Sequence, residues 1–393
     1  MANGCKRHGG LLSPSMAWLG RFVRDFVGHL PGGRRFRVEL EQSRRHRDVL
    51  AERLKRSEEQ RDTLRRRLDA RRARARAMQP DPTVLRQVMP TRHHTAVVVA
   101  KRAESAARES AFAVKSPCYS ETLRHPELAL PVDAIECISI AGLNWHTPVE
   151  RGSADGVTRR LLWHGRLPLE EILQTRELAV GRVMIDIGAN IGTTSIPRVI
   201  LGDFNWIYAI EPDPRNYACL VRNIIFSQMR GLVLPDRVAI GDVNGEMTMR
   251  LMKSGTHHLV TQPEDIREEE RITVPCFTLD TWIERMGIDL SDVGFIKSDT
   301  QGWDARVLAG AERVLARRHI AWQIEFSPAM LARSGKSIAE VFALLERHFT
   351  HFIDLRREAG ARVRRTQELR PSLEDIGSGR RRYTNLLLYN AST

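Results

Sequence analysis

Residues 182–194 read Arg-Val-Met-Ile-Asp-Ile-Gly-Ala-Asn-Ile-Gly-Thr-Thr, and this stretch decides the fold. An apolar run typical of a strand ends in Asp186, and a tight turn through Gly188, Asn190 and Gly192 then leads into a helix. Doubly wound α/β proteins seat nucleotide-like ligands at such turns, at the carboxyl edge of a parallel sheet. The stretch therefore predicts a ligand-binding α/β domain.

A second acidic residue stands where the next strand is expected to end. The apolar run Trp206–Ile210 is followed by Glu211, 19 residues after Gly192. A carboxylate at this position of the second strand accepts hydrogen bonds from the ribose hydroxyls of a nucleotide-like ligand. We therefore predict that Glu211 binds a ribose.

The turn differs from the fingerprint of dinucleotide-binding proteins, which keeps glycines where the backbone touches a pyrophosphate. Asn190 occupies the middle position here, and Asp186 repels a phosphate but suits an ammonium group. S-adenosylmethionine carries an ammonium, a carboxylate, a sulfonium and a ribose, and no phosphate. The residues favour it as the cofactor, and an NAD-dependent dehydrogenase is the alternative enzyme.

The positive charge of the chain is concentrated at one end. The net charge is +13, and residues 1–77 hold 21 of the 61 basic residues but only 9 of the 48 acidic ones. The rest is close to neutral, whereas a nucleic-acid-binding domain is itself basic, so a nucleic acid partner is not expected. The five cysteines are scattered, and no apolar run reaches the ~18 residues of a membrane span, which favours a cytoplasmic protein.

Three segments precede the expected domain of residues 126–393. Residues 1–32 contain an amphipathic helix that suits either an anionic membrane surface, peripheral to the inner membrane, or a partner helix. Residues 33–77 are rich in arginine and predict a long helix, for which a homo-oligomeric coiled coil, a solvated stalk and a surface for RNA or anionic lipid all stay open. Residues 78–125 contain four prolines and predict a linker with little fixed structure.

Strands and helices then alternate, which predicts a doubly wound, mostly parallel seven-stranded sheet, with the N-terminal helical segments as an extension. An inserted hairpin is expected from two alternating runs, Glu246–Met252 and Arg271–Phe277. The predicted strands are Val183–Ile187, Trp206–Ile210, Arg237–Ile240, Gly294–Lys297, Ile320–Glu325, His351–Leu355 and Tyr383–Tyr389. The predicted helices are 193–201, 214–228, 279–286, 304–316 and 337–348.

From residue 183 onward the chain resembles the FkbM family of S-adenosylmethionine-dependent methyltransferases. The resemblance rests on an ordered set of motifs: Asp-Ile-Gly-Ala-Asn-Ile-Gly at 186–192, Ala-Ile-Glu-Pro-Asp-Pro at 209–214, Asn223, Val-Ala-Ile-Gly-Asp at 238–242 with Gly245, Thr-Leu-Asp at 278–280, Phe-Ile-Lys-Ser-Asp-Thr-Gln-Gly at 295–302, Val-Leu-Ala-Gly-Ala at 307–311 and Ile-Glu-Phe at 324–326. It implies a class I, Rossmann-like methyltransferase fold and O-methylation of a sugar, glycolipid or polyketide hydroxyl. The chain departs from the family where Gln301 follows Asp299, because the family often has a carboxylate at the position of Gln301.

The donor-binding residues expected from this pattern lie at three strand ends. We expect the backbone of Gly188, Asn190 and Gly192 to contact the methionine part of the cofactor, and Asp186 to hold its ammonium directly or through water. Val238 and Ala239, at the end of the third predicted strand, are expected beside the adenine, and Asp242 is expected to form a turn with Gly245.

The catalytic residues are expected at the ends of the fourth and fifth strands. Asp299 is predicted to act as the base or to orient the acceptor hydroxyl, and Lys297, two positions earlier, to keep Asp299 ionised. Glu325 is predicted to bind acceptor hydroxyls. Capping of the next helix by Asp299 and an ion pair of Glu325 are the structural alternatives. His257 and His258, in the loop of the inserted hairpin, are either catalytic or ordinary surface residues. No metal site is expected, because three oxygen ligands do not cluster in the sequence.

The sequence thus predicts a methyltransferase that acts on a small-molecule or glycan acceptor. The alternative outside enzymology is a scaffold or tether that binds a membrane or a partner protein and carries an inactive methyltransferase-like domain.

Overall fold

The structure of the 393-residue chain is a computed structural model that describes residues 93–124, 135–140, 143–148, 167–178, 183–250, 258–260, 268, 271–356, 362–376 and 381–391. All of them belong to one compact unit, residues 80–393. The predicted helices of residues 1–32 and 33–77 lie outside the described residues. Within the described ranges, none of the helices has the length and apolar character that a membrane span requires.

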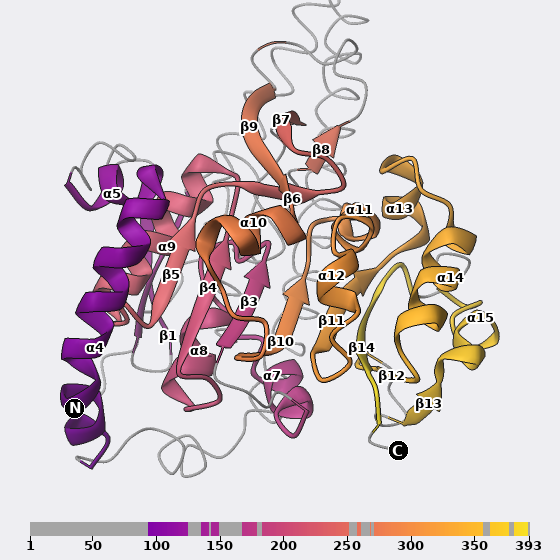
Figure 1. Ribbon diagram of the computed structural model, residues 1–393, viewed down its shortest axis with the longest axis horizontal. Helices are drawn as coiled ribbons and strands as arrows, with labels where there is room; N and C mark the ends of the chain where they lie inside the picture. Colours follow the sequence, from indigo (N-terminus) through magenta and orange to yellow (C-terminus); the bar gives the residue numbers. More distant parts are fainter. Residues whose placement is uncertain are drawn as a thin grey trace, which may run out of the picture. The chain divides into compact units, whose positions relative to one another are not determined.

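The described residues form a central eight-stranded sheet in the order β13-β12-β14-β11-β10-β3-β4-β5 (Figure 1). Its strands are β3 Val183–Ile187, β4 Trp206–Ile210, β5 Val233–Asp236, β10 Val293–Ser298, β11 Ala321–Phe326, β12 His351–Asp354, β13 Val363–Arg365 and β14 Thr384–Tyr389. The pairs from β11 through β10, β3 and β4 to β5 are parallel, and β14 is antiparallel to both β11 and β12. The sheet is therefore mixed, with one strand more than the predicted seven.

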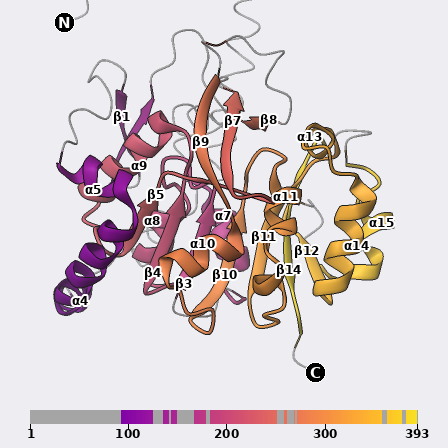
Figure 2. The same ribbon diagram turned by 45° about the horizontal axis from the view of Figure 1, so that its top comes forward.

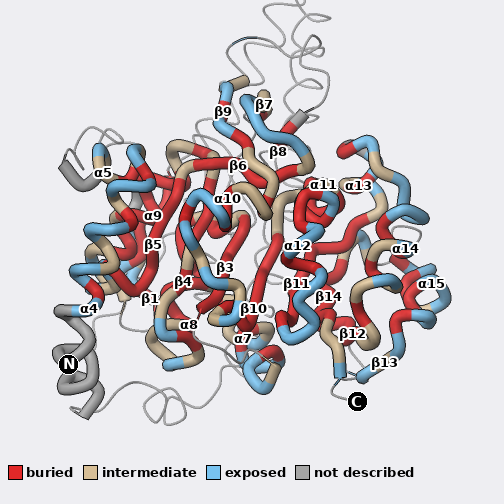
Figure 3. The backbone as a smooth tube through the Cα atoms, viewed as in Figure 1, coloured by how far each residue is buried: buried red, intermediate tan, exposed pale blue. Residues whose placement is uncertain are grey.

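The order reverses between β3 and β10, since β3 pairs with β4 on one side and with β10 on the other. This is the switch point at which open α/β sheets bind ligands. The inner strands β3, β10 and β11 are buried at every residue, as Figure 3 shows. Alternate side chains pack on opposite faces, with Ile185 in one hydrophobic cluster and Met184 in another, so a continuous apolar run is stable there.

Helices cover both faces of the sheet. α8 Ser195–Ile200 and α9 Pro214–Phe226 pack on one face, and α10 Leu279–Met286, α11 Asp304–Ala309 and α12 Glu312–Leu315 pack on the other. Further helices are α7 Leu169–Thr175, α13 Pro328–Arg333, α14 Ile338–His348, α15 Leu369–Ser372 and the 3-10 helix Thr366–Glu368.

Caps explain where two of these helices begin. The Asp213 side chain accepts hydrogen bonds from two backbone N–H groups of α9, and Pro214 is the first residue of that helix. Ser337 and Glu340 form a capping box at the start of α14. The predicted helix 304–316 is divided in two, because the backbone approaches closely at Gly310, where an added Cβ would lie 2.0 Å from the Gly241 carbonyl oxygen.

The third predicted strand was wrong. Residues 233–236 form β5 at the edge of the main sheet, whereas Ala239–Gly241 forms β6, which leaves that sheet and pairs with β9. Pro235 weakens the strand signal of β5, but an edge strand tolerates a proline because one side of its backbone needs no partner.

The inserted hairpin is confirmed. β7 Gly245–Arg250 pairs antiparallel with β9 Arg271–Thr278 and with β8 His258–Val260, and together with β6 they form a four-stranded sheet. The hairpin projects beyond the carboxyl ends of β3, β4 and β10 (Figure 1). Its loop, residues 251–257, lies outside the described residues.

The prediction of a linker over residues 78–125 was wrong from residue 93 onward. His93–Lys115 forms the 23-residue helix α4 and Pro117–Arg124 forms α5, beside the β5 edge of the sheet (Figure 1, Figure 2). Ser116 Oγ donates to Asp236 Oδ1 at 2.6 Å, and Phe112 and Tyr119 are buried in the main hydrophobic cluster. Pro117, counted as a helix breaker, is the first residue of α5, where a proline is tolerated.

A separate hairpin, β1 Ile135–Ile140 with β2 Leu143–Pro148, contributes Ile140 and Trp145 to the hydrophobic cluster that contains α9. The predicted strand at residues 160–163 lies outside the described residues.

Candidate active site

A cavity of about 310 Å³ lies at the carboxyl ends of β3, β4 and β10. The hairpin sheet covers it with Met249 of β7 and Leu259 of β8. The lining residues are Pro168, Glu171, Ile187, Gly188, Ala189, Asn190, Thr193, Thr194, Ile210, Glu211, Pro212, Asn216, Val238, Ala239, Ile240, Met249, Leu259, Lys297, Asp299, Thr300, Gln301, Trp303, Glu325, Met330, Arg356, Tyr383 and Asn385.

The glycine turn, residues 188–192, has positive φ angles at three positions, a backbone conformation that most residues avoid. Gly188 has φ 77°, and a Cβ added there would lie 2.1 Å from the Asp299 carbonyl oxygen. Asn190 has φ 52°, which asparagine tolerates better than most side chains. The turn is thus pressed against the end of β10, and its backbone forms one wall of the cavity.

Glu211 connects the turn to the end of β4. Its Oε2 accepts the Asn190 backbone N–H at 2.8 Å, and its Oε1 accepts the Asp213 backbone N–H at 2.9 Å. The residue is 6% exposed and lines the cavity. Burial, and then the charge of Asp213, raise the pKa of Glu211 to about 8. An empty site at neutral pH therefore favours the protonated carboxyl.

Three charged side chains near the glycine turn, those of Asp186, Lys297 and Asp299, are connected by ion pairs. Lys297 Nζ lies 3.4 Å from Asp186 Oδ1 and 3.4 Å from Asp299 Oδ2. Burial opposes the charge of Lys297, but the two carboxylates outweigh it and raise the Lys297 pKa, so the ammonium persists. The predicted pairing of Lys297 with Asp299 is present, and it also includes Asp186, which pairs with Lys297 because β3 and β10 are adjacent.

Two of the predicted donor-binding residues do not line the cavity. Asp186 is fully buried, and its Oδ2 accepts a hydrogen bond from Ser195 Oγ at 2.6 Å. Gly192 has φ 91°, and an added Cβ would lie 2.9 Å from Leu220 Cδ1, so it packs the turn against α9. Gly192 was predicted to contact the donor through its backbone, and Asp186 to hold the ammonium directly or through water; neither residue is among those that line the cavity.

The other predicted site residues line the cavity. Val238 and Ala239 do so although they follow the third strand instead of ending it. Asp299 and Glu325 line it from β10 and β11. Asp299 does not cap α11, whose N-cap, Trp303, makes no side-chain capping bond.

Glu325 is a buried carboxyl with weak hydrogen bonding. It is 7% exposed, and Gln301 Nε2 lies 3.5 Å from its Oε2. Burial, and then the charge of Asp299, raise the Glu325 pKa well above its usual value, so the neutral acid is favoured. Asp304, which accepts from Ser298 Oγ at 2.6 Å, has its pKa raised to about 6 by burial. Two carboxyl groups with raised pKa values, those of Glu325 and Asp304, thus lie near Asp299.

The sequence reasoning missed most of the polar wall, which we define as Glu171, Glu325, Arg356, Tyr383 and Asn385. Glu171 accepts Arg356 Nη2 at 3.0 Å and Asn385 Nδ2 at 2.6 Å. Arg356 Nη1 donates to the Tyr383 hydroxyl at 2.6 Å, and its guanidinium lies 4.3 Å from the centre of the Tyr383 ring. Apart from Glu325, which stands in the Ile-Glu-Phe motif at 324–326, these residues belong to no short motif, so no sequence signal marked them.

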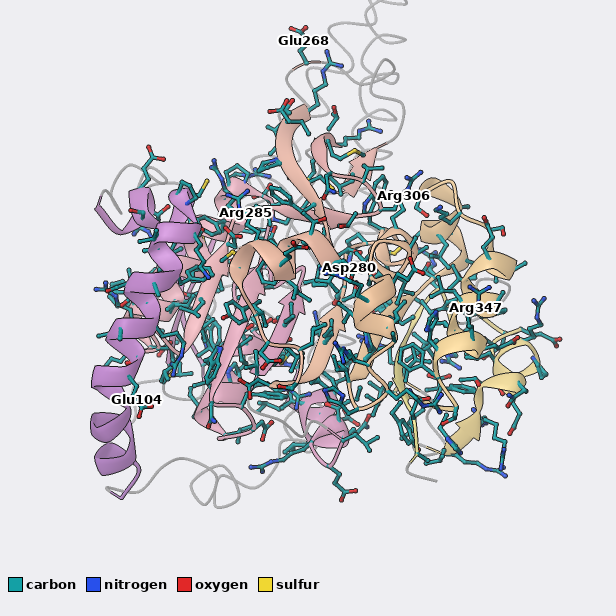
Figure 4. The ribbon with its side chains drawn as sticks, in the orientation of Figure 1. Glu104, Glu268, Asp280, Arg285, Arg306 and Arg347 are labelled. Carbon is teal, nitrogen blue, oxygen red and sulfur yellow. The ribbon has the colours of Figure 1, made fainter. Side chains whose placement is uncertain are left out.

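Two further predictions concern loops near the cavity. His257 lies outside the described residues, and His258 is the first residue of β8. Asp242 forms ion pairs with Arg306 at 2.9 Å and with Lys336 at 3.5 Å, so it connects β6 to α11 (Arg306 is labelled in Figure 4). Among the described residues, no group of three His, Cys, Asp or Glu side chains stands where it could hold a metal ion.

The parallel strands, the helices on both faces and the cavity at the switch point define a class I, Rossmann-like α/β fold of the methyltransferase type. Residues 186–362 match the family model of the methyltransferase FkbM domain. This match covers the part of the chain in which the sequence motifs resemble the FkbM methyltransferase family. No curated protein matches the chain.

Three solved structures are similar to parts of the chain. The methyltransferase FkbM from Methylobacillus flagellatus KT is 19% identical with a TM-score of 0.34, over 54% of this chain and 44% of that one, so the match spans less than half of that protein. The putative transferase PH0793 from Pyrococcus horikoshii is 11% identical with a TM-score of 0.32, over 66% and 73%. M. jannaschii TYW2 in complex with AdoMet is 11% identical with a TM-score of 0.30, over 65% and 85%.

Proposed function

We propose that the chain is an S-adenosylmethionine-dependent methyltransferase that methylates a hydroxyl oxygen of a sugar, glycolipid or polyketide-type acceptor. The observation that carries the proposal is that one cavity joins Glu211 and the glycine turn to the Lys297–Asp299 pair. A candidate donor-binding carboxylate and a candidate base thus line the same cavity.

The residues at one end of the cavity fit S-adenosylmethionine. The Glu211 carboxylate suits the ribose hydroxyls, and the missing Cβ of Gly188 leaves the backbone free to approach a ligand. The Asn190 side-chain oxygen is buried and has no hydrogen-bond partner among the described residues, so it can accept from the ammonium group. Val238 and Ala239 offer an apolar surface for the adenine.

When bound, the donor supplies a methyl group on a sulfonium. The Asp299 carboxylate would take the proton that the acceptor hydroxyl loses when it receives the methyl group. Lys297 Nζ lies 3.4 Å from Asp299 Oδ2 and holds this carboxylate in place beside the acceptor. A positioned base contributes ~10²–10⁴-fold to the rate, and alignment of the reacting atoms contributes about 7–11 kcal/mol.

The test combines binding and transfer. We expect wild-type protein to bind S-adenosylmethionine and S-adenosylhomocysteine in calorimetry, and to transfer a labelled methyl group to hydroxyl acceptors. Glu211→Ala is expected to weaken donor binding by about 1–3 kcal/mol, because the buried ribose hydroxyls lose their partner. If the wild type binds neither compound, the scaffold with an inactive domain becomes the better explanation. If it binds nicotinamide dinucleotide instead, the dehydrogenase does.

A further inference from the structure

The polar wall lies largely outside the matched family domain. Glu171 precedes residue 186, and Tyr383 and Asn385 follow residue 362. α7 and β14 therefore complete a cavity that the family domain forms only in part. What these two elements add is a dense set of hydrogen-bonding groups at the end opposite the glycine turn.

Arg356 is the central residue of this wall. Its two Nη groups are engaged by Glu171 and Tyr383, but its buried Nε–H has no hydrogen-bond partner among the described residues. Its position is well defined, since its backbone N–H donates to Asp354 Oδ1 at 3.2 Å and Asp354 is 1% exposed. A fixed donor that lacks a partner at the wall of a cavity is suited to a ligand oxygen.

The charges near the wall compensate one another. The cationic side chains among the described lining residues are Lys297 and Arg356. Lys297 is paired with Asp186 and Asp299, and Arg356 is paired with Glu171. An anionic acceptor group would therefore meet no uncompensated cation. Burial of an unpaired charge is costly, so this end of the cavity selects against carboxylates and phosphates.

The wall also disfavours an acceptor that is mostly apolar. Glu171, Glu325, Arg356 and Asn385 present donors and acceptors that an alkyl chain would leave without partners, whereas the hydroxyls of a ring could pair with them. The Tyr383 side chain lines the cavity beside them. Such a combination suits a compact, polyhydroxylated molecule.

We propose that the polar wall is the acceptor subsite, that it takes an uncharged polyhydroxylated ring, and that Arg356 determines specificity by donating its Nε–H to a ring or hydroxyl oxygen. The proposal rests on the proposed function, because the ring presents its reacting hydroxyl to Asp299. It narrows the acceptor to neutral glycosyl groups.

The experiment uses full-length protein saturated with S-adenosylhomocysteine. Saturation-transfer NMR is recorded with methyl glycosides of neutral hexoses and deoxyhexoses, and with a hexuronate and a hexose 6-phosphate of the same size. We expect saturation transfer to at least one neutral glycoside and none to the two anions. Arg356→Lys keeps the charge beside Glu171 but removes the Nε–H, and it should weaken glycoside binding by about tenfold. Arg313→Met, which changes an exposed arginine of α12, is the matched control and should bind like wild type.

The outcomes separate the two proposals. If S-adenosylhomocysteine does not bind, the proposed function fails. If it binds but no neutral glycoside does, or the anions bind as well as the neutral rings, the subsite proposal is overturned. The same holds if Arg356→Lys, shown by its circular dichroism spectrum and thermal transition to be folded, binds the glycosides like wild type.

Discussion

The glycine turn and the polar wall bound the same cavity but differ in how far apart their partners lie in the chain. Glu211 and Asn190, which are joined by a hydrogen bond at the turn, are 21 residues apart in the sequence. Glu171 and Asn385, which are joined by a hydrogen bond in the polar wall, are 214 residues apart. The turn is held by backbone contacts within one β-α-β unit, and the wall by side chains from α7, β11, β14 and the end of β12. The donor end can therefore be encoded in a short motif, and the acceptor end cannot.

The largest expected effect concerns the backbone contact that defines the turn. Gly188→Ala should destabilise the protein by about 4 kcal/mol, because the new Cβ would collide with the Asp299 carbonyl oxygen at a positive φ. Gly202 has nearly the same φ of 74° but open space around its Cβ, so Gly202→Ala should cost only about 1–2 kcal/mol. Urea unfolding of both variants measures the difference. Equal losses would mean that the turn is not pressed against β10.

A second prediction concerns Lys297 and its ion pairs with Asp186 and Asp299. Lys297→Met leaves the fully buried Asp186 without its cation and should lower the free energy of unfolding by about 3 kcal/mol. Arg313→Met removes an exposed pair with Glu284 and should cost less than about 1 kcal/mol. Denaturant titration of both variants is the measurement. A loss for Lys297→Met as small as the control would show that Asp186 is not charged in the folded protein.

A third prediction separates binding from chemistry. Asp299→Asn should lower turnover by about a hundredfold, equivalent to about 2.7 kcal/mol, and leave donor affinity nearly unchanged, because Asp299 acts at the acceptor hydroxyl. Labelled-methyl transfer and calorimetry measure the two quantities. Asp289→Asn, in an exposed turn, is the control. Unchanged turnover would remove Asp299 as the base and would weaken the contrast between the two ends.

The smallest expected effect is a proton released at the donor end. The Glu211 pKa of about 8 means that the free carboxyl is largely protonated at pH 7, while ribose binding requires the carboxylate. Affinity for 5′-methylthioadenosine, which has the ribose but no amine that titrates here, should therefore rise about tenfold per pH unit up to pH 8 and then level off. Calorimetry in buffers of different ionisation enthalpy measures the released proton. Glu211→Gln should abolish the pH dependence, and a slope that persists in that variant would assign the proton elsewhere.

The raised pKa of Glu211 also makes the stability of the folded protein depend on pH. The Glu211 pKa is about 8 in the folded chain, against the ordinary value of 4.5 expected after unfolding. The folded state therefore binds more protons between these values. The contribution of Glu211 to stability is complete below about pH 4.5 and is lost as the pH rises towards 8. Bound donor should therefore stabilise the folded protein most at alkaline pH.

Local sequence predicted the donor end because its determinants are local. The strand before Asp186, the positive φ of the turn glycines and the carboxylate at the end of β4 all follow from residues within one β-α-β unit. The α10 helix was predicted with its bounds because Thr278 caps its start and Gly287, with φ 64°, ends it. Asp299 and Lys297 were paired correctly because residues two apart on a strand share a face.

The errors arose where distant segments compete with local pattern. The third strand was predicted four residues too late, because Pro235 weakens the strand signal of β5. Only the sheet order shows that β5 is an edge strand, where a proline is tolerated. α4 and α5 are helices where a linker was predicted, and Ser116, which lies between them, donates a hydrogen bond to Asp236, 120 residues away.

The sequence by itself determined the class of fold, the switch point at β3 and the carboxylates that end three of its strands, since each depends on neighbours along the chain. Only the tertiary structure decided that Asp186 lies behind the turn and that Arg356 is held between Glu171 and Tyr383. The physical reason is that burial and side-chain pairing across the sheet depend on which strands become neighbours. β10 places Lys297 beside Asp186 of β3, and β14 places Asn385 beside Glu325 of β11.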